Sequence, residues 1–217
     1  MMKDIRLLLA NKLLKVNAIK LQPDRPFVWL RGWNSPIYAD NRMALSYPQL
    51  RNFIKTELSR IIVEFYPDAE VIAGVTIGAI APAAIVADAL GLPLIYVRDK
   101  AKDHGLENQI EGNIKPGQKV VLFEDVISTG ANCIAAAQTV MIAGGQVLGV
   151  AALFSYEFAM AREALEAEQL PVHTLTDYNA MIEAAVESGE LTRTDVEMLQ
   201  QWHDDPENWT PLPEPND

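Results

Sequence analysis

Short apolar runs alternate with segments of helical spacing through the middle of this 217-residue chain. The runs that suit buried strands lie at residues 71–75, 94–97, 120–123 and 147–154. The segments that suit helices lie between them, at residues 79–90 and 131–143, and glycines follow both. Strands separated by helices in this order predict an α/β fold with a central, mostly parallel sheet flanked by helices. Ligands bind such sheets beyond the carboxyl ends of the strands.

The N-terminal part adds two helices and a small β element to this pattern. An amphipathic helix opens the chain, and a longer one is predicted over residues 46–65, where Ser46 and Gln49 have the spacing of a capping box. Between them, residues 27–30 and 36–39 are short apolar or aromatic segments that suggest a hairpin or a loop-rich cap.

The C-terminal part suggests a last strand and two further helices. Residues 172–175 suit the strand, and Thr176 and Thr192 suit N-caps. The length is that of one sizeable domain, so we expect residues 1–217 to form a single domain.

Charge excludes several kinds of partner. Eighteen Lys and Arg against 29 Asp and Glu give a net charge of −11. This excess argues against a broad surface for nucleic acid or an anionic membrane. We therefore expect an anionic ligand to be held by a local cationic cluster.

Other features point to a cytoplasmic protein without a structural metal. Cys133 is the one cysteine and cannot close an intramolecular disulfide, and the three histidines are too far apart for metal-ligand spacing. The apolar run at residues 7–10 is too short for a signal-peptide core. Longer uncharged stretches are interrupted by Gly, Pro and polar residues, so we expect no membrane span.

The most informative segment follows the apolar run at 120–123. Glu124 and Asp125 come first, and Ser128, Thr129 and Gly130 then precede a helix. Hydroxyls and backbone N–H groups at a helix N-terminus bind phosphate, and carboxylates accept hydrogen bonds from sugar hydroxyls. A phosphorylated ribose would suit both halves of the segment.

Other phosphate-binding motifs are missing. The sequence has neither GxxxxGK[ST] nor GxGxxG. The alternative is a plain strand-to-helix turn capped by the acidic pair, but such a turn needs only one capping residue.

A long connection between residues 97 and 119 carries a cationic cluster. Arg98, Lys100, Lys102 and His104 gather at its start, within an acidic protein. A solvated, flexible loop is one interpretation, and a functional loop is the other.

These segments resemble those of a known family. Residues 124–132 are similar to the binding motif for phosphoribosyl diphosphate (PRPP) in type I phosphoribosyltransferases. The run from Arg98 through Lys102-Asp103-His104-Gly105 resembles the mobile catalytic loop of orotate phosphoribosyltransferases. Residues 35–42 resemble the hood of that family, and residues 74–79 its diphosphate-contacting loop.

The resemblance implies a fold, a reaction and partners. The fold would be type I phosphoribosyltransferase-like, with an N-terminal hood at about residues 20–45 and a helical C-terminal extension at about residues 176–217. The reaction would transfer ribose 5-phosphate from PRPP to N1 of orotate, giving orotidine 5′-monophosphate and diphosphate. Mg²⁺ would arrive with PRPP, with no direct protein ligand. The protein would be a homodimer with shared active sites.

The resemblance also implies roles for individual residues. The catalytic residues would be Lys102, His104 and Asp125. The residues that bind orotate would be Ser128, Tyr38 and Tyr156. The residues that bind PRPP would be Arg98, Lys100, Lys102, His104, Glu124, Asp125, Val126, Ile127, Ser128, Thr129, Gly130, Ala131, Asn132, Thr76, Ile77 and Gly78.

Three positions depart from the family pattern. Leu30, Asp99 and Tyr156 stand where many members carry a lysine, a second basic residue and an arginine. Two alternatives therefore stay open: a phosphoribosyltransferase for a purine or uracil, and a regulatory protein that senses PRPP without catalysis. The acidic charge and the lack of a basic DNA-binding segment argue against the second.

Overall fold

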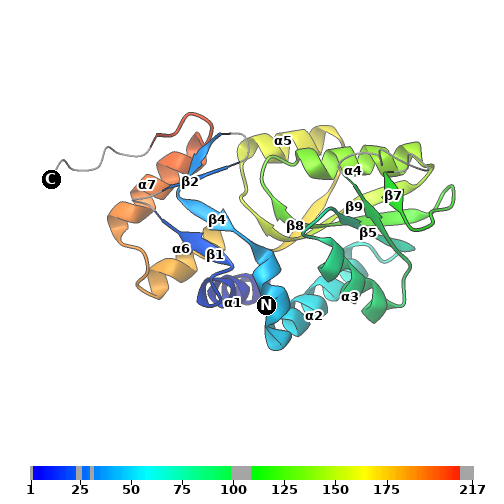
Figure 1. Ribbon diagram of the computed structural model, residues 1–217, viewed down its shortest axis with the longest axis horizontal. Helices are drawn as coiled ribbons and strands as arrows, with labels where there is room; N and C mark the ends of the chain where they lie inside the picture. The colour runs from blue at the N-terminus through cyan, green and yellow to red at the C-terminus, as the bar shows by residue number, and fades with distance from the viewer. Residues whose placement is uncertain (1, 23–25, 30–31, 99–108, 211–217) are drawn as a thin grey trace.

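A six-stranded sheet forms the centre of the computed structural model, which describes residues 2–22, 26–29, 32–98 and 109–210 (Figure 1). The strand order is β10-β9-β8-β5-β6-β7, and all neighbours are parallel except β6 and β7. The predicted mostly parallel sheet is confirmed, and β7 is an addition. The strands are β5 (Val71–Val75), β6 (Leu94–Val97), β7 (Ile110–Glu111), β8 (Lys119–Ile127), β9 (Gln146–Ser155) and β10 (Val172–Asp177).

Helices cover both faces of this sheet, as the alternating pattern predicts (Figure 1). One face packs against α1 (Met2–Lys15), α2 (Pro48–Phe65) and α3 (Ile80–Leu90). The other face carries α4 (Ala131–Ile142) and α5 (Ala159–Ala167). The sequence analysis missed α5. All five residues of β5 are buried, as a strand covered on both faces requires.

The segment expected to form a hood folds as two small antiparallel pairs. Strand β1 (Ile19–Leu21) pairs with β4 (Ile37–Ala39), and β2 (Phe27–Val28) pairs with β3 (Asn34–Ser35). A 3₁₀ helix, η1 (Asn41–Ser46), then leads into α2. The two predicted segments both form strands, but they do not pair with each other: residues 27–28 pair with 34–35, and residues 37–39 pair with β1.

Two predicted helix starts are wrong. Ser46 belongs to η1 rather than capping α2, which begins at Pro48 after Tyr47 without a side-chain cap. Proline suits the first position of a helix, and it pushes the preceding residue into extended backbone. Thr176 ends up in β10, and the side chain of Asp177 caps α6 (Tyr178–Glu187) instead.

The predicted N-cap at Thr192 is confirmed. Its hydroxyl accepts a hydrogen bond from the backbone N–H of Asp195 in α7 (Arg193–Asp204), and the Asp195 carboxylate accepts one from the backbone N–H of Thr192. This reciprocal capping box fixes the start of the last described helix.

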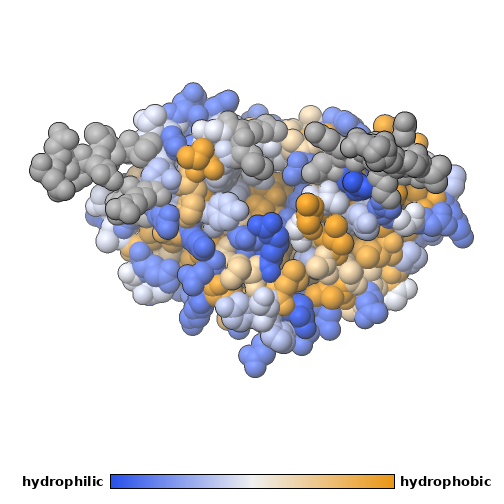
Figure 2. Space-filling view, in the orientation of Figure 1, coloured by the Kyte–Doolittle hydropathy of each residue, from blue (hydrophilic) through white to orange (hydrophobic). Residues whose placement is uncertain are grey.

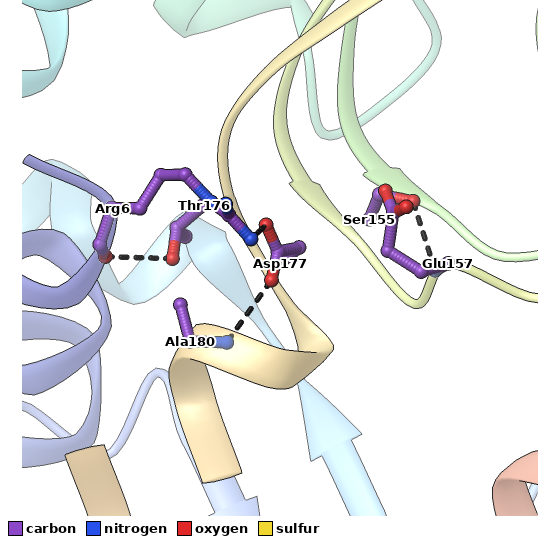
Figure 3. A network of polar contacts seen from close by, with 6 residues as sticks. All are labelled: Arg6, Ser155, Glu157, Thr176, Asp177 and Ala180. Atoms are coloured by element: carbon purple, nitrogen blue, oxygen red, sulfur yellow. Dashed lines mark hydrogen bonds and ion pairs between the residues drawn. The ribbon is translucent and has the colours of Figure 1, made fainter. Parts of the chain in front are cut away.

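A buried carboxylate connects the edge strand β10 to the N-terminal helix α1 (Figure 3). Asp177 is 3% exposed, accepts a hydrogen bond from the backbone N–H of Ala180 at 3.0 Å, and forms an ion pair with Arg6 of α1. The hydroxyl of Thr176 donates to the Arg6 carbonyl at 2.9 Å. A buried charge needs such partners, so α1 is held against the edge strand β10.

Hydrophilic side chains lie among the hydrophobic ones on the face shown in Figure 2. In the part of the chain that the structure describes, no helix combines the length and hydropathy needed to cross a bilayer. Localisation in the cytoplasm stays a prediction.

Candidate active site

A cavity of about 750 Å³ lies beyond the carboxyl ends of β5, β8 and β9, where the sheet pattern predicts a binding site. Its walls come from the hood, from the turn after β5, from the end of β8 with the start of α4, and from the end of β9. The lining residues are Val28, Trp29, Trp33, Tyr38, Ala39, Asp40, Arg42, Thr76, Ile77, Gly78, residues 124–133 and Tyr156.

The predicted phosphate-binding segment forms one wall, but β8 is longer than predicted. It continues to Ile127 because residues 124–127 pair with the parallel strand β9. The turn itself is therefore only Ser128, Thr129 and Gly130. Gly130 has a φ of +77° and precedes α4, whose first N–H groups have no acceptor within the helix. This arrangement suits an anion.

The two carboxylates of β8 differ in environment. Glu124 is 4% exposed, and its Oε1 accepts a hydrogen bond from the backbone N–H of Asp125 at 3.0 Å. Asp125 is more open and lies against Gly78, where an added Cβ would overlap its carboxylate. Among the described residues, no group of three or more His, Cys, Asp and Glu side chains is arranged to hold a metal.

Cys133 is the last residue of this wall, and its side chain is buried. Its sulfur is 3.9 Å from Oε2 of Glu124. Burial, and then the negative charge of Glu124, raise the pKa of the thiol. The thiol therefore stays protonated, which agrees with packing and argues against a nucleophile.

The predicted diphosphate-contacting turn lies directly beside Asp125. Thr76, Ile77 and Gly78 follow β5, and the Thr76–Ile77 peptide bond is cis. The backbone N–H of Thr76 donates to the Val97 carbonyl at 3.1 Å, which fixes the turn to the neighbouring strand. The tertiary structure thus brings two predicted PRPP-binding segments together.

All three predicted orotate-binding residues line the cavity: Tyr38, Ser128 and Tyr156. Tyr156 is 2% exposed, and its hydroxyl accepts a hydrogen bond from the backbone N–H of Ala39 at 3.2 Å. Burial raises the pKa of this phenol, so it stays neutral.

The hood supplies residues that the sequence analysis did not assign to the site. Arg42 is the one cationic side chain among the described lining residues, and it donates to Asp40 through Nε at 2.6 Å and Nη2 at 2.9 Å. The hydrogen bond from Arg42 holds the pKa of Asp40 below its usual value. Trp29 adds an aromatic surface. No periodicity or spacing in the sequence singled out these side chains.

Asn41 connects the hood to the carboxylates. It is buried, and its Nδ2 donates to the backbone carbonyl of Asp125 at 2.8 Å. Its Oδ1 has no hydrogen-bond partner. The hood is therefore fixed to the strand that carries Asp125.

Most of the cationic loop lies outside the described residues. Arg98 is described, and it pairs with Glu111 at 3.4 Å outside the cavity lining. Lys100, Lys102 and His104 lie outside the described residues, as do Leu30 and Asp99. Their roles remain predictions.

The fold and this cavity define the chain as a phosphoribosyltransferase. Residues 51–186 match the phosphoribosyl transferase domain family. The chain is 50% identical to the orotate phosphoribosyltransferase of Porphyromonas gingivalis, over 96% of this chain and 99% of that protein, and 48% identical to that of Bacillus caldolyticus, over 93% and 97%. It belongs to the orotate phosphoribosyltransferase family, an enzyme family.

Solved structures agree with the expected type I fold. The crystal structure of orotate phosphoribosyltransferase from Aeropyrum pernix is similar with a TM-score of 0.74 and 25% identity, covering 85% of this chain and 99% of that one. The fold class inferred from the sequence is therefore confirmed.

Proposed function

We propose that this protein transfers ribose 5-phosphate from PRPP to N1 of orotate in the cytoplasm, giving orotidine 5′-monophosphate and diphosphate. One observation carries the proposal: a single cavity joins the phosphate-binding segment, residues 128–132, to the aromatic hood. The names of the relatives favour orotate over a purine or uracil, and favour an enzyme over a regulatory PRPP sensor.

The phosphate end of the cavity would hold the donor. Residues 128–132 would bind the 5′-phosphate, Glu124 and Asp125 the ribose hydroxyls, and Thr76, Ile77 and Gly78 the diphosphate. As the bond from C1′ to the diphosphate oxygen breaks, positive charge develops on the ribose ring. The N1–C1′ bond forms with inversion, and N1 loses its proton. Positioning and charge stabilisation would supply most of the rate.

Mg²⁺ would enter with PRPP, because a diphosphate and ribose hydroxyls offer the oxygen ligands that this ion prefers. The carboxylates of Glu124 and Asp125 line the cavity and suit contacts to metal-bound water. Their arrangement fits an ion carried by the substrate rather than one held by the protein alone.

The hood would hold orotate. Tyr38, Tyr156 and Ser128 would surround the base. We assign Arg42 to the carboxylate of orotate, because Nη1 lies outside its pair with Asp40 and remains a donor on a cationic group.

The cationic loop would neutralise the leaving diphosphate. By family resemblance, Lys102 and His104, with Lys100 and Arg98, would contact the diphosphate when the loop closes and excludes water. His104 also suits proton transfer. The protein would be a homodimer in which this loop serves the partner's site.

The shared site has a direct test. The variants Lys102→Ala and Asp125→Asn should each lose most activity, and mixing them should restore part of it in heterodimers, where one site has both intact groups. If mixed dimers form and stay inactive, the loop does not cross between subunits.

The reaction is tested by following orotate absorbance with PRPP and Mg²⁺, with adenine, hypoxanthine and uracil as controls. We expect loss of orotate and no turnover of the other bases. If the enzyme used another base faster than orotate, that base would be the acceptor instead. Calorimetry with PRPP and Mg²⁺ tests binding of the donor separately, and absence of binding would contradict the proposed function.

A further inference from the structure

The aromatic wall of the cavity is supported from behind by the last described helix. Trp29 and Tyr156 line the cavity, and both rings contact Trp202 of α7. In Figure 1, α7 lies beside β2 of the hood. The match to the phosphoribosyl transferase domain covers residues 51–186, so the hood and α7 both lie outside the matched residues.

Trp202 joins α7 to the hood. Its side chain is completely buried, and its Nε1 donates to the backbone carbonyl of Asn34 in β3 at 3.0 Å. Its ring meets Trp29 edge-on, with centroids 5.8 Å apart and planes at 84°. Edge-to-face pairs of this kind are favourable and directional, so the ring of Trp202 fixes the orientation of Trp29.

His203, the next residue, joins α7 to Tyr156. Its Nε2 lies 2.7 Å from the backbone carbonyl of Tyr156. Because a carbonyl only accepts hydrogen bonds, Nε2 carries the proton in this contact. The imidazole also stacks on the ring of Tyr178, with centroids 4.3 Å apart, which holds it in place.

Tyr156 is thereby held from three sides. Its backbone N–H donates to the carbonyl of Ile127, the residue before the phosphate-binding turn, at 2.9 Å. Its hydroxyl accepts from Ala39 of the hood, and its carbonyl accepts from His203. A shift of α7 would therefore move the base side of the cavity. Residues 128–132 are instead anchored at one end by β8, which is paired in the sheet up to Ile127, and at the other by α4, which begins at Ala131.

We propose that Trp202 and His203 are positioning residues that set the affinity of the cavity for the base. They act through Trp29 and Tyr156 and contact no reacting atom. This inference rests on the proposed function, because it takes orotate as the ligand of that wall. The inference predicts different effects on the two substrates. Loss of the contacts of Trp202 and His203 should weaken binding of orotate and leave binding of PRPP unchanged.

The test compares three variants with the wild-type enzyme. His203→Leu removes the donor to Tyr156, His203→Gln keeps an N–H donor on a chain of similar reach, and Trp202→Phe keeps a ring but loses the hydrogen bond to Asn34. Trp209→Phe is the matched control, because Trp209 is a partly buried tryptophan of the same terminal segment that, among the described ring contacts, has none with Trp29 or Tyr156. The readouts are KM for orotate at saturating PRPP, kcat, and Kd for PRPP by calorimetry.

We expect His203→Leu to raise KM for orotate about three- to tenfold, the range for loss of one hydrogen bond. Its Kd for PRPP should stay within about twofold of wild type, since a selective loss of binding raises KM alone. Trp202→Phe should shift KM in the same direction, His203→Gln should restore it, and Trp209→Phe should behave as wild type.

Three results would overturn the inference: an unchanged KM for orotate in both His203→Leu and Trp202→Phe, an equal loss of PRPP affinity, or a Gln variant as impaired as the Leu variant. If His203→Leu fails to fold, the two conservative variants decide alone. A wild-type enzyme inactive with orotate in the same assay would instead contradict the proposed function.

Discussion

The two ends of the cavity are built in different ways. At the phosphate end, the lining at residues 124–133 comes from one continuous stretch of strand, turn and helix. At the base end, Trp29, Arg42 and Tyr156 come from segments far apart in the sequence, and α7 supports them from behind. A continuous stretch keeps its geometry through local backbone rules, whereas an assembled wall depends on every contact between its parts.

This difference predicts different responses to substitution. Changes at the phosphate end should affect chemistry, since the donor and its charges would lie there in the proposed reaction. Changes at the base end should affect selection and affinity of the acceptor. Changes near the start of the edge strand β10, away from the cavity, should affect only the stability of the fold.

The largest expected effect is that of Asp125→Asn. The amide keeps the shape but loses the negative charge that would face the ribose, so we expect kcat to fall by more than about tenfold. Steady-state rates with both substrates measure this. Asp68→Asn, an exposed carboxylate paired with Lys119, is the control. Unchanged turnover in Asp125→Asn would place the catalytic charge elsewhere.

Gly78→Ala should reproduce part of that loss. The new methyl group would overlap the Asp125 carboxylate and displace it, so we expect a smaller fall in kcat/KM, of about threefold or more. In a double-mutant cycle the substitution should cost little once Asp125 is already Asn. Additive effects would mean that Gly78 acts independently of Asp125.

Arg42→Gln should act on the acceptor. Without the cationic donor, KM for orotate should rise about threefold to tenfold, while Kd for PRPP changes little. Arg162→Gln, an exposed arginine of α5, serves as the control. A matching loss of PRPP affinity would mean that Arg42 serves the phosphate end, which would break the comparison.

The smallest expected effect concerns His173, near the start of β10 and away from the cavity. Its ring stacks on Phe65 at 3.8 Å, and burial lowers its pKa below 6.5. The folded protein therefore binds this proton less readily than the unfolded chain. Its contribution to stability is complete above pH about 6.5 and falls as the pH decreases through the folded pKa.

Urea midpoints between pH 8 and pH 5 measure this contribution. His173→Phe should flatten the decrease and leave KM for both substrates unchanged. An altered KM would show that the edge of the sheet is coupled to the cavity.

Local sequence patterns predicted most of the sheet and the phosphate end. The central strands follow from continuous apolar runs, because burial on both faces needs them, and α3 and α4 follow from segments of helical spacing that end at glycine. The end of β8 was missed, since Glu124 and Asp125 look like a turn until their pairing with β9 is known. The start of α2 was misplaced because Pro48, not the spacing of Ser46 and Gln49, sets it.

The base end could be predicted only in part. Family resemblance predicted roles for Tyr38, Ser128 and Tyr156, which all line the cavity, but it did not predict the pair of Arg42 with Asp40 or the bond from Asn41 to Asp125. The bond from Asn41 to Asp125 joins residues that are far apart in the sequence, and the pair of Arg42 with Asp40 forms at the start of η1. No periodic pattern in the sequence predicts either contact.

The sequence by itself determined the parallel α/β fold, the turn that suits a phosphate, and the family. The fold and the turn follow from neighbouring residues, whose hydrophobic pattern and backbone preferences act locally. The family follows from the resemblance of the sequence motifs. Only the tertiary structure decided which side chains meet around the base, and that α7 supports them through Trp202 and His203. The physical reason is that such contacts form between surfaces brought together by burial, which fixes their distances only once the whole chain has folded.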